Sequence, residues 1–470
     1  MKCVVVGGGV SGLAAAHRLT ELAQETGEAP DLLLVEAGGH LGGVIETELR
    51  DGYVLEGGPD SMITDKPWGL ALARRLGLDS ELIGTQEQHR RSFVVHQGRL
   101  EPVPEGFQLL APSRFGPLVG TRIFSWAGKG RMALDLILPR RDGDDDESLG
   151  SFVTRRLGRE ALERMAQPMI AGIYGADPMK LSLQATLPRF LDMERQHGSV
   201  IRAMLRARAR QAKSAPHNAN SQTGVSGARY GLFVSFRNGM QTLTDALAQR
   251  LPAGAVRLRT RATDLTRSGD RWNLTLEPGG VLEADRVILA LPAYQSASLV
   301  RPLDAELADH LACIPYAASG TMSLAYREEQ VPHPLDGFGF VTPSREGLTI
   351  LGCTFTHRKY AHRAPAGIAL LRAFLGEQAL TGRDDAELDR LVREDLRRLL
   401  GITAAPLWTK IARHPRSMAQ YDVGHLVRVA EMERRVAAFP GLALCGNGFR
   451  GIGIPDCVRA GEAAAEAIRA

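Results

Sequence analysis

Two short apolar runs near the start of the chain flank an amphipathic stretch. Residues 3–6 and 32–35 are uninterrupted Cys, Val and Leu, which is typical of strands buried on both faces of a parallel sheet. Residues 13–23 lie between these runs and repeat apolar positions at helical spacing. The order strand, helix, strand predicts a βαβ unit, and therefore an α/β domain at this end of the chain.

A glycine-rich turn joins the first strand to the helix, and an acid closes the second strand. Gly7, Gly9 and Gly12 form GxGxxG in the context that this motif requires. The first glycine permits a tight turn, the second lets the backbone approach a pyrophosphate, and the third lets helix and strand pack closely. Glu36 follows at close to the spacing of about 20 residues expected of an acid that accepts both ribose hydroxyls. The combination predicts a dinucleotide site, with a coincidental glycine turn as the alternative.

The end of the chain repeats this pattern of strand, glycines and helix. Residues 441–445 are typical of a strand, and residues 446–456 form a glycine-rich turn before an alanine-rich helix. The turn formally contains a second GxGxxG, but too little chain follows Gly451 for a further strand and its acid. We therefore expect this turn and helix to return to the first domain. A helix start that merely caps itself is the alternative.

Composition adds size and compartment to this picture. At 470 residues the chain exceeds one hydrophobic core, because single cores stop growing at roughly 250 to 300 residues. Hydrophobic residues are 44% and charged residues 23%, as in ordinary globular proteins, so we expect two or three folded domains. The five cysteines form no CxxC pair or zinc-ligand cluster, which favours a reducing compartment and no metal site. No signal peptide or membrane-spanning run is present, so we expect a cytoplasmic protein.

A second glycine-rich stretch and the segment after it carry a family resemblance. Residues 37–45 (AGGHLGGVI) follow Glu36, and residues 52–61 (GYVLEGGPDS) come next. In order and spacing they resemble the RxGG and GxxxExGP segments that the amine oxidase and porphyrinogen oxidase superfamily places along bound FAD. His40 replaces the arginine of RxGG, and Val44 replaces a basic residue that often follows. We therefore expect backbone amides to carry more of the diphosphate binding.

Three later segments resemble porphyrinogen oxidases in particular. Residues 167–178 (QPMIAGIYGADP) are similar to the family's GIYAGD segment, and residues 181–188 (LSLQATLP) to its LS..ATFP segment. Residues 418–425 (MAQYDVGH) resemble MPQY..GH. Flavin amine oxidases and carotenoid desaturases, the more distant enzyme alternatives, would share the two ends of the chain but not these segments. A flavin-free binding protein of the GDP-dissociation-inhibitor type is the non-enzyme alternative, and the intact glycines and Glu36 weigh against it.

Two further segments look most like the Gram-positive-type branch that oxidises coproporphyrinogen III. They are residues 92–95 (SFVV) and residues 452–457 (IGIPDC). The protoporphyrinogen IX branch commonly carries an arginine where Ser92 stands, and its absence favours coproporphyrinogen. Arg90 and Arg91 lie close by in the sequence, so protoporphyrinogen IX stays open as the alternative substrate.

The resemblance implies an α/β fold made of a Rossmann-type FAD domain, a discontinuous α+β substrate domain and a helical, membrane-facing subdomain. Residues 236–243 open a helix at the family's GGLQTL position, and residues 281–290 resemble the sheet segment that leads into the substrate domain. The expected FAD-binding domain spans residues 1–65, 228–292 and 415–470, the substrate-binding domain 66–105, 190–227 and 293–414, and the helical subdomain 106–189.

The implied activity is an FAD-dependent, oxygen-dependent six-electron oxidation of a porphyrinogen to a porphyrin in haem biosynthesis. In each of three rounds flavin N5 accepts hydride from a meso carbon, and dioxygen then reoxidises the flavin and yields hydrogen peroxide. No Ser/His/Asp group or carboxylate pair stands out in the sequence, so we name no catalytic base. We expect the protein mainly to orient the macrocycle in a broad apolar slot with a few cations for the propionates.

The resemblance also assigns contacts to individual residues. Lys66 is the expected partner of a substrate propionate, with a solvated surface lysine as the alternative. Gly172 is the expected backbone acceptor for a pyrrole N–H, with a helix-packing glycine as the alternative. The expected FAD contacts are Gly7, Gly8, Gly9, Val10, Ser11, Gly12, Glu36, Ala37, Gly42, Gly43, Val44, Gly58, Pro59, Asp60, Ser61, Ala262, His414, Gly446, Ile452, Gly453 and Ile454.

Porphyrinogen and dioxygen are the expected partners, with a ferrochelatase as a downstream one. The basic run at 202–213 has no interleaved aromatic residues to stack bases, so we expect an exposed helix face leading into a mobile loop at 214–227 and no nucleic acid. The acidic run at 142–147 lacks the pattern of a calcium loop and precedes a helix that starts near Ser148. Residues 107–139 mix aromatic, apolar and basic residues, and the family uses this region to approach membranes, so peripheral contact with the inner face of the membrane stays open as an alternative to a purely cytoplasmic location.

Overall fold

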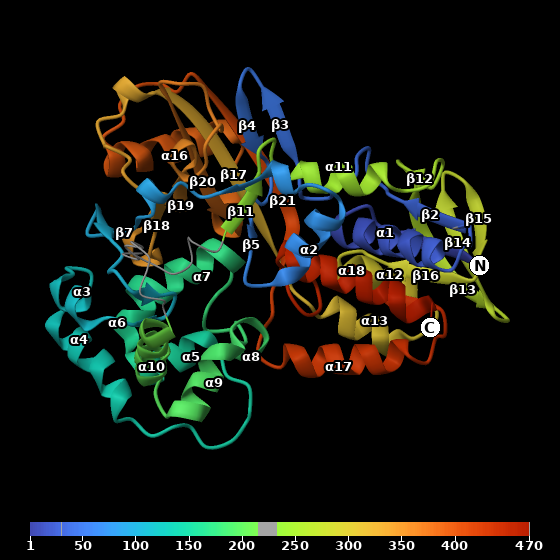
Figure 1. Ribbon diagram of the computed structural model, residues 1–470, viewed down its shortest axis with the longest axis horizontal. Helices are drawn as coiled ribbons and strands as arrows, with labels where there is room; N and C mark the ends of the chain where they lie inside the picture. The colour runs from blue at the N-terminus through green and yellow to red at the C-terminus, as the bar shows by residue number, and fades with distance from the viewer. Residues whose placement is uncertain (30, 215–232, 470) are drawn as a thin grey trace.

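Figure 1 shows the computed structural model, which describes residues 1–470 except 30, 215–232 and 470. A parallel sheet with its helices lies beside a larger, mixed sheet and a region made of short helices (Figure 1). The expected mobile loop after Ser214 lies outside the described residues, as does the predicted domain boundary at 228.

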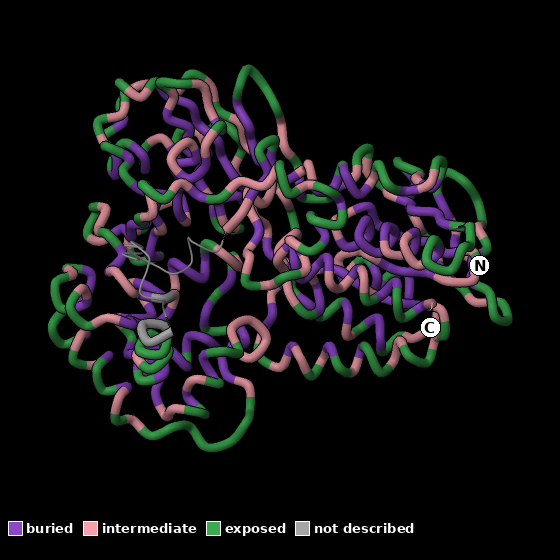
Figure 2. Tube along the Cα trace, in the orientation of Figure 1, coloured by how far each residue is buried: buried purple, intermediate pink, exposed green. Residues whose placement is uncertain are grey.

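A five-stranded parallel sheet forms around the first strand of the chain. Its order is β12 (Val256–Arg257), β2 (Asp31–Val35), β1 (Lys2–Val6), β16 (Arg286–Leu289) and β22 (Leu442–Leu444). Val4 pairs with Leu33 on one side and with Val287 on the other. The predicted βαβ unit is confirmed, and the apolar strands are buried on both faces as their composition predicts (Figure 2).

The two ends of the chain meet on this sheet. Strand β22 pairs with β16, and helix α18 (Ile454–Arg469) lies beside helix α1 (Val10–Glu25), both starting at the same end of the sheet (Figure 1). A Cβ at Gly461 would lie 2.2 Å from the carbonyl oxygen of Ser11, so this close approach of the helices requires a glycine. The prediction that the final turn and helix return to the first domain is confirmed.

Other helices and a small meander complete this region. The helices are α11 (Gln241–Gln249), α12 (Ala293–Val300), α13 (Ala305–Ala312) and α17 (His425–Val436), and the meander is β13 (Arg261–Ser268), β14 (Arg271–Glu277) and β15 (Gly280–Ala284). The apolar segment at 281–290 is two strands, β15 and β16, in different sheets. They separate at Asp285, whose carboxylate accepts a hydrogen bond from the backbone N–H of Lys2 at 2.7 Å.

A seven-stranded sheet forms the second region. Its order is β21 (Trp408–Ala419), β17 (Tyr316–Arg327), β20 (Ile368–Gly376), β19 (Ile350–Phe355), β18 (Gly339–Val341), β7 (Ser92–His96) and β8 (Arg99–Pro102). Helix α16 (Asp385–Leu400) packs the buried side chains of Leu388, Val392 and Leu396 onto one face of the sheet. Strands from residues 92–102 and 316–419 therefore share one core.

The third region is made of short helices. They are α3 (Phe115–Gly120), α4 (Trp126–Ala133), α5 (Leu149–Leu157), α6 (Arg159–Ala161), α7 (Gln167–Tyr174), α8 (Leu183–Thr186), α9 (Pro188–His197) and α10 (Val200–Ser214), with the 3-10 turn η3 (Leu134–Leu136). The hydroxyl of Ser148 caps α5, which confirms the helix start expected after the acidic run. No described helix is both long and apolar enough to span a bilayer.

Buried charges fix the later helices of this region in place. Asp135 and Arg156 are fully buried and paired at 2.6 Å, and Asp135 also accepts hydrogen bonds from the Ser199 hydroxyl and the Ile201 N–H at the start of α10. Helices α9 and α10 thus pack with the short helices, although the predicted division placed residues 190–227 in the substrate-binding domain. The division into three domains otherwise stays a prediction.

Short connecting strands link the regions. Strands β3 (Thr47–Arg50) and β4 (Tyr53–Glu56) form a hairpin, while β5 (Met62–Ile63), β11 (Phe233–Phe236) and β6 (Leu82–Gly84) form a small sheet. Helices α2 (Pro67–Arg75), α14 (Thr356–Lys359) and α15 (Glu377–Leu380) and the pair β9 (Phe107–Gln108) and β10 (Ala111–Pro112) complete the elements used below.

Candidate functional site

The turn between β1 and α1 is shaped by three glycines with different surroundings. A Cβ at Gly12 would lie 1.9 Å from the Gly7 carbonyl oxygen, and one at Gly7, whose φ is +107°, would lie 2.5 Å from that of Ala290. A Cβ at Gly9 would meet no protein atom within 4 Å. Gly7 and Gly12 therefore serve the packing of the turn, whereas Gly9 borders open space.

Helix α1 begins at this open side without a side-chain cap. Gly9 is its N-cap, and Val10 and Ser11 form its first turn. The unpaired N–H groups and the positive end of the helix dipole make such a start a site for phosphate. The predicted phosphate-binding role of Gly9, Val10 and Ser11 is compatible with this geometry.

Glu36 at the end of β2 is oriented by backbone amides. Its Oε2 accepts a hydrogen bond from the Gly8 N–H at 2.7 Å, and its Oε1 accepts one from the Gly38 N–H at 2.6 Å. Each carboxylate oxygen keeps a second acceptor position, so the acid can still accept ribose hydroxyls. The structure thus adds two partners that the spacing of Glu36 alone did not reveal.

The second glycine stretch lies directly against the first. The N–H of Gly42 donates to the Gly8 carbonyl at 2.8 Å, and a Cβ at Gly43 would lie 3.3 Å from the Cα of Gly9. Ala37, His40 and Val44 are exposed, and the ring of His40 contacts only the neighbouring Leu41 carbonyl among the described residues, at 3.1 Å. Two glycine segments separated by a helix and a strand in the sequence therefore form one continuous surface of backbone.

The segment 57–61 closes against the same surface. A Cβ at Gly58 would lie 1.7 Å from the Val44 carbonyl oxygen, which leaves room only for glycine. The Gly57 N–H donates to the Glu46 carbonyl at 2.8 Å. Pro59, Asp60 and Ser61 follow, and the Asp60 side chain is only 12% exposed.

Strands of the seven-stranded sheet hold this segment from the other side. The Gly57 carbonyl accepts hydrogen bonds from His414 Nε2 at 2.9 Å and from the Thr321 hydroxyl at 3.2 Å, and the Gly58 carbonyl accepts one from the Arg372 guanidinium. These donors lie on β21, β17 and β20. The resemblance predicted His414 as an FAD contact, which stays a prediction, and the sequence did not single out Thr321 or Arg372.

Asp60 lies at the centre of a buried charge cluster. The Lys359 ammonium donates to both of its oxygens, at 3.0 and 2.8 Å, and the Ser61 hydroxyl donates to one at 2.6 Å. Burial alone would raise the pKa of Asp60, but the cations of Lys359 and Arg372 hold it well below its usual range. The carboxylate is therefore ionised and tied to α14, which follows strand β19 of the second sheet.

The C-terminal segment supplies another helix start beside α1. Gly446, with φ +133°, leads from β22 into the turn, and Ile452, Gly453 and Ile454 stand at the start of α18. Helix α18 lies against α1, and in its first turn the Cys457 thiol donates to the Ile452 carbonyl at 3.9 Å. Backbone groups of two helix starts, α1 and α18, thus border the same part of the molecule (Figure 1).

The chain after β12 lines the far end of this surface. The Thr260 N–H donates to the Glu36 carbonyl at 2.9 Å, and the Arg259 N–H donates to the Gly38 carbonyl at 2.8 Å. Ala262 follows on β13, half-buried and next to a register shift with β14. The predicted contact of Ala262 with FAD stays a prediction, and the residue's place beyond Glu36 is compatible with it.

The two predicted substrate residues lie in different surroundings. Lys66 Nζ forms a 2.6 Å ion pair with Asp456, and the lysine side chain is 43% exposed whereas the aspartate is buried. Gly172 is exposed on α7, and a Cβ there would lie 3.8 Å from the Val341 side chain of β18. Because Gly172 is not enclosed, close packing of helices does not explain it.

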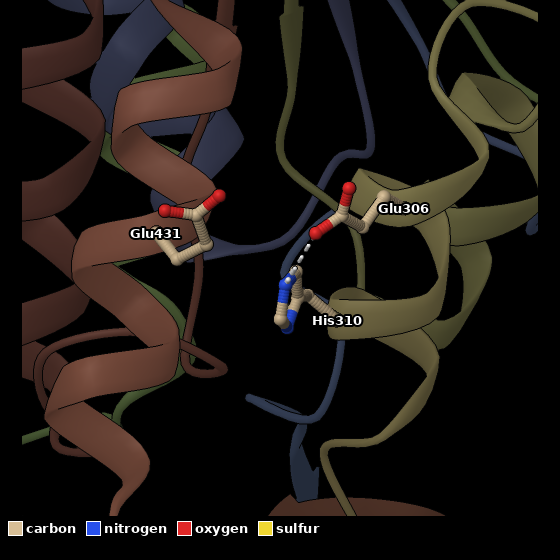
Figure 3. Close-up of side chains that lie close together, drawn as sticks. All are labelled: Glu306, His310 and Glu431. Carbon is tan, nitrogen blue, oxygen red and sulfur yellow. Dashed lines mark ion pairs between the residues drawn. The ribbon is translucent and has the colours of Figure 1, made fainter.

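A group of two acids and a histidine lies at the surface between helices α13 and α17. Glu306 and His310 on α13 face Glu431 on α17 (Figure 3), and among the described residues this is the one group close enough to hold a metal ion. The Arg435 guanidinium pairs with Glu306 and with Glu431, the latter at 2.9 Å. Arg434 and Arg435 therefore already pair with these acids.

Stability should fall as the pH drops because His425 is buried in neutral form. Burial lowers the pKa of His425 to about 4, below the ordinary value of 6.5, so its contribution is complete above pH 6.5 and is lost toward pH 4. The loss should reach about 3 kcal/mol by pH 4. Urea unfolding at pH 7.5 and pH 5 should show a smaller difference for His425→Phe than for the unaltered protein. Equal differences would contradict this assignment.

The glycines, acid and helix starts fit FAD on the evidence of their geometry. Gly9 leaves a space that no protein atom enters, Glu36 is pre-oriented by two amides, and the starts of α1 and α18 border the same surface. An extended dinucleotide needs these features, namely close approach to phosphates, an acid for the ribose and amides for polar edges.

Comparison with known proteins agrees with this fit. The model of the family described as flavin-containing amine oxidoreductases matches residues 10–469. Coproporphyrinogen III oxidase of Bacillus subtilis is 36% identical over 98% of this chain and 96% of its own length. Chloroplastic protoporphyrinogen oxidase of Oryza sativa is 32% identical over 97% of this chain and 86% of its own. A solved Exiguobacterium structure, provisionally assigned to the protoporphyrinogen oxidases, superposes with a TM-score of 0.85 at 30% identity and covers 99% of this chain and 98% of its own.

Proposed function

Because this chain belongs to the flavin-containing amine oxidoreductase family, we propose that it is an FAD-dependent porphyrinogen oxidase of haem biosynthesis. The single observation that carries the proposal is end-to-end similarity to enzymes named for porphyrinogen oxidation, at 36% identity. The geometry agrees, because the FAD-fitting surface is built from both ends of the chain and is held by the second sheet.

The residues of this chain would hold the cofactor through its backbone. Amides at the start of α1 would bind the diphosphate, Glu36 would accept ribose hydroxyls, and residues 57–61 together with 452–454 would contact the flavin. Bound FAD accepts the electrons that leave the substrate. The protein's own part is to orient the macrocycle and exclude water, and no side chain is assigned as a catalytic base.

Coproporphyrinogen III is the proposed substrate. Ser92 is buried, and its side chain supplies no cation at the position where the protoporphyrinogen branch commonly carries an arginine. Arg91 is tied to Asp336 at 2.5 Å on the surface. Lys66 would bind a propionate with N–H groups that Asp456 leaves free, since an ammonium has three donors.

Dioxygen is the proposed electron acceptor, with hydrogen peroxide released. Three two-electron rounds account for the six electrons that separate a porphyrinogen from a porphyrin. The porphyrin would then pass to a ferrochelatase. Cofactor and substrate thus define a reaction that needs no metal ion of the protein's own.

Anaerobic mixing with substrates tests the proposed function. Coproporphyrinogen III should bleach the flavin absorption band, at about 450 nm, faster than protoporphyrinogen IX does. Putrescine should leave this band unchanged. Lys66→Met should weaken coproporphyrinogen binding about tenfold, the order expected from one charge-assisted contact. Lys129→Met, which alters a lysine on α4, serves as the matched control. Bleaching by putrescine alone would overturn the assignment.

Peripheral membrane contact through α3 and α4 is a further part of the proposal. Trp126 is 73% exposed and Val119 is 52% exposed, and the Lys129 ammonium links them by lying 4.5 Å from the Trp126 ring and donating to the Val119 carbonyl. Ile137 beyond α4 is 78% exposed. Aromatic, apolar and basic side chains together suit a bilayer interface. Cosedimentation with anionic vesicles should decrease for Trp126→Ser, and equal cosedimentation would count against this contact.

A further inference from the structure

Two buried aromatic side chains bond the turn that precedes α18. Tyr421 and His425 are 1% and 0% exposed, and their rings stack at 3.9 Å between centroids with planes 11° apart. Both belong to the segment 418–425, whose resemblance to the family gives neither residue a role. Their polar atoms account for where that turn lies.

Tyr421 bonds the turn at two points. Its hydroxyl donates to the Asn447 carbonyl at 2.7 Å and accepts from the Gly451 N–H at 2.8 Å. One phenol thus joins the two ends of a five-residue turn and uses both the donor and the acceptor capacity of its oxygen. Phenylalanine would keep the ring and lose both bonds.

His425 bonds the middle of the same turn. Its Nε2 lies 2.7 Å from the Phe449 carbonyl, which can only accept, so Nε2 carries the proton. Nδ1 is then an acceptor and has no partner among the described residues although it is buried. An apolar residue would pack there without this cost, so the imidazole is better explained by its bond to Phe449 than by packing.

The two side chains are themselves fixed from the opposite side. The Tyr421 carbonyl accepts from the Ser182 N–H at 2.7 Å, and the Gln420 amide donates to the Tyr174 carbonyl at the end of α7 at 3.1 Å. The Gly424 N–H donates to Asp146 at 3.0 Å. The helical region therefore holds the segment 420–425, which in turn holds the turn 447–451.

We propose that Tyr421 and His425 are positioning residues that aim the start of α18 at the flavin. Hydrogen bonding fixes the carbonyls of Asn447 and Phe449 on the side of the turn that faces this pair. The amides that follow, at residues 452–454, then start α18 beside α1. The inference rests on the proposed flavin site and assigns no chemical step to either side chain.

The experiment compares the purified, flavin-loaded protein with single variants that lose either the tyrosine hydroxyl or the imidazole. Tyr421→Phe and His425→Phe keep the stacked rings, and Tyr326→Phe, in the core of the second sheet, is the matched control. FAD dissociation, the visible circular dichroism of the flavin and hydrogen exchange of residues 446–453 are measured, with apoprotein unfolding as a check on the fold.

Both variants should bind FAD about tenfold more weakly, alter the flavin dichroism and speed exchange at 446–453, while Tyr326→Phe should change none of these. His425→Gln, which retains an N–H donor, should recover part of the affinity. Flavin dichroism and FAD affinity equal to those of the unaltered protein would overturn the inference while leaving the proposed function intact. If the unaltered protein binds no FAD, the proposed function itself fails. If a variant does not fold, the His425→Gln protein decides the question by the same measurements.

Discussion

Replacing Gly9 with valine is expected to abolish most FAD binding while leaving the fold of the apoprotein unchanged. A Cβ at Gly9 meets no protein atom within 4 Å, and its φ of −70° is open to any residue, so the side chain costs the protein little. The added carbons would instead occupy the place from which the backbone approaches a pyrophosphate. We expect a loss of affinity of at least about 100-fold, or about 3 kcal/mol. Titration of apoprotein with FAD, followed by flavin fluorescence, measures it.

Two other glycines provide the controls for this substitution. A Cβ at Gly84 on β6 would also meet no atom within 4 Å, so Gly84→Val should affect neither stability nor FAD binding. Gly12→Val should destabilise the apoprotein itself, because its Cβ would collide with the Gly7 carbonyl at 1.9 Å. FAD binding by Gly9→Val as tight as that of the unaltered protein would show that the cofactor does not lie at this turn.

Replacing Lys359 with methionine is expected to destabilise the protein by about 3 kcal/mol, since it leaves the Asp60 carboxylate buried without its main partner. The remaining cation, Arg372, lies 3.9 Å from Asp60 and cannot replace two direct hydrogen bonds. Urea unfolding of the apoprotein at pH 7.5 measures the loss. The effect is on the scaffold of the segment 57–61, so FAD should also bind more weakly.

Substituting Asp60 as well as Lys359 distinguishes the stability lost through packing from the stability lost through an unpaired buried charge. Asp60→Asn combined with Lys359→Met removes both charges, so the double variant should be more stable than Lys359→Met alone. Lowering the pH should reduce the defect of Lys359→Met, because the pKa of Asp60 rises without the ammonium and the protonated acid needs no counterion. Additive effects of the two substitutions would contradict the assigned pairing.

The parts of the site that follow from local chemistry could be predicted from the sequence. Gly12 is required by its contact with Gly7 within one strand, turn and helix, and Glu36 stands at the end of the next strand. The return of the last helix to the first domain could also be expected, because residues 441–456 repeat the local pattern of strand, glycine turn and helix. Each of these inferences needs only neighbours in sequence.

The parts that depend on contacts between distant segments could not be predicted. Lys359 and Arg372 reach residues 57–60 from α14 and β20, and no spacing in the chain marks either as a partner of Asp60. The pairing of Lys66 with Asp456 is equally remote in sequence. Tyr421 and His425 stood in a recognisable segment, but only the fold shows that they bond the turn before α18.

One measurement tests the central claim that both ends of this chain build a single FAD site. The full chain is purified, its visible spectrum recorded and any released cofactor identified and counted against protein. We expect a yellow protein with a flavin absorbance maximum at about 450 nm and one FAD per chain. The Gly9→Val protein should fail to retain this FAD. A colourless protein that takes up no FAD on incubation would contradict the account.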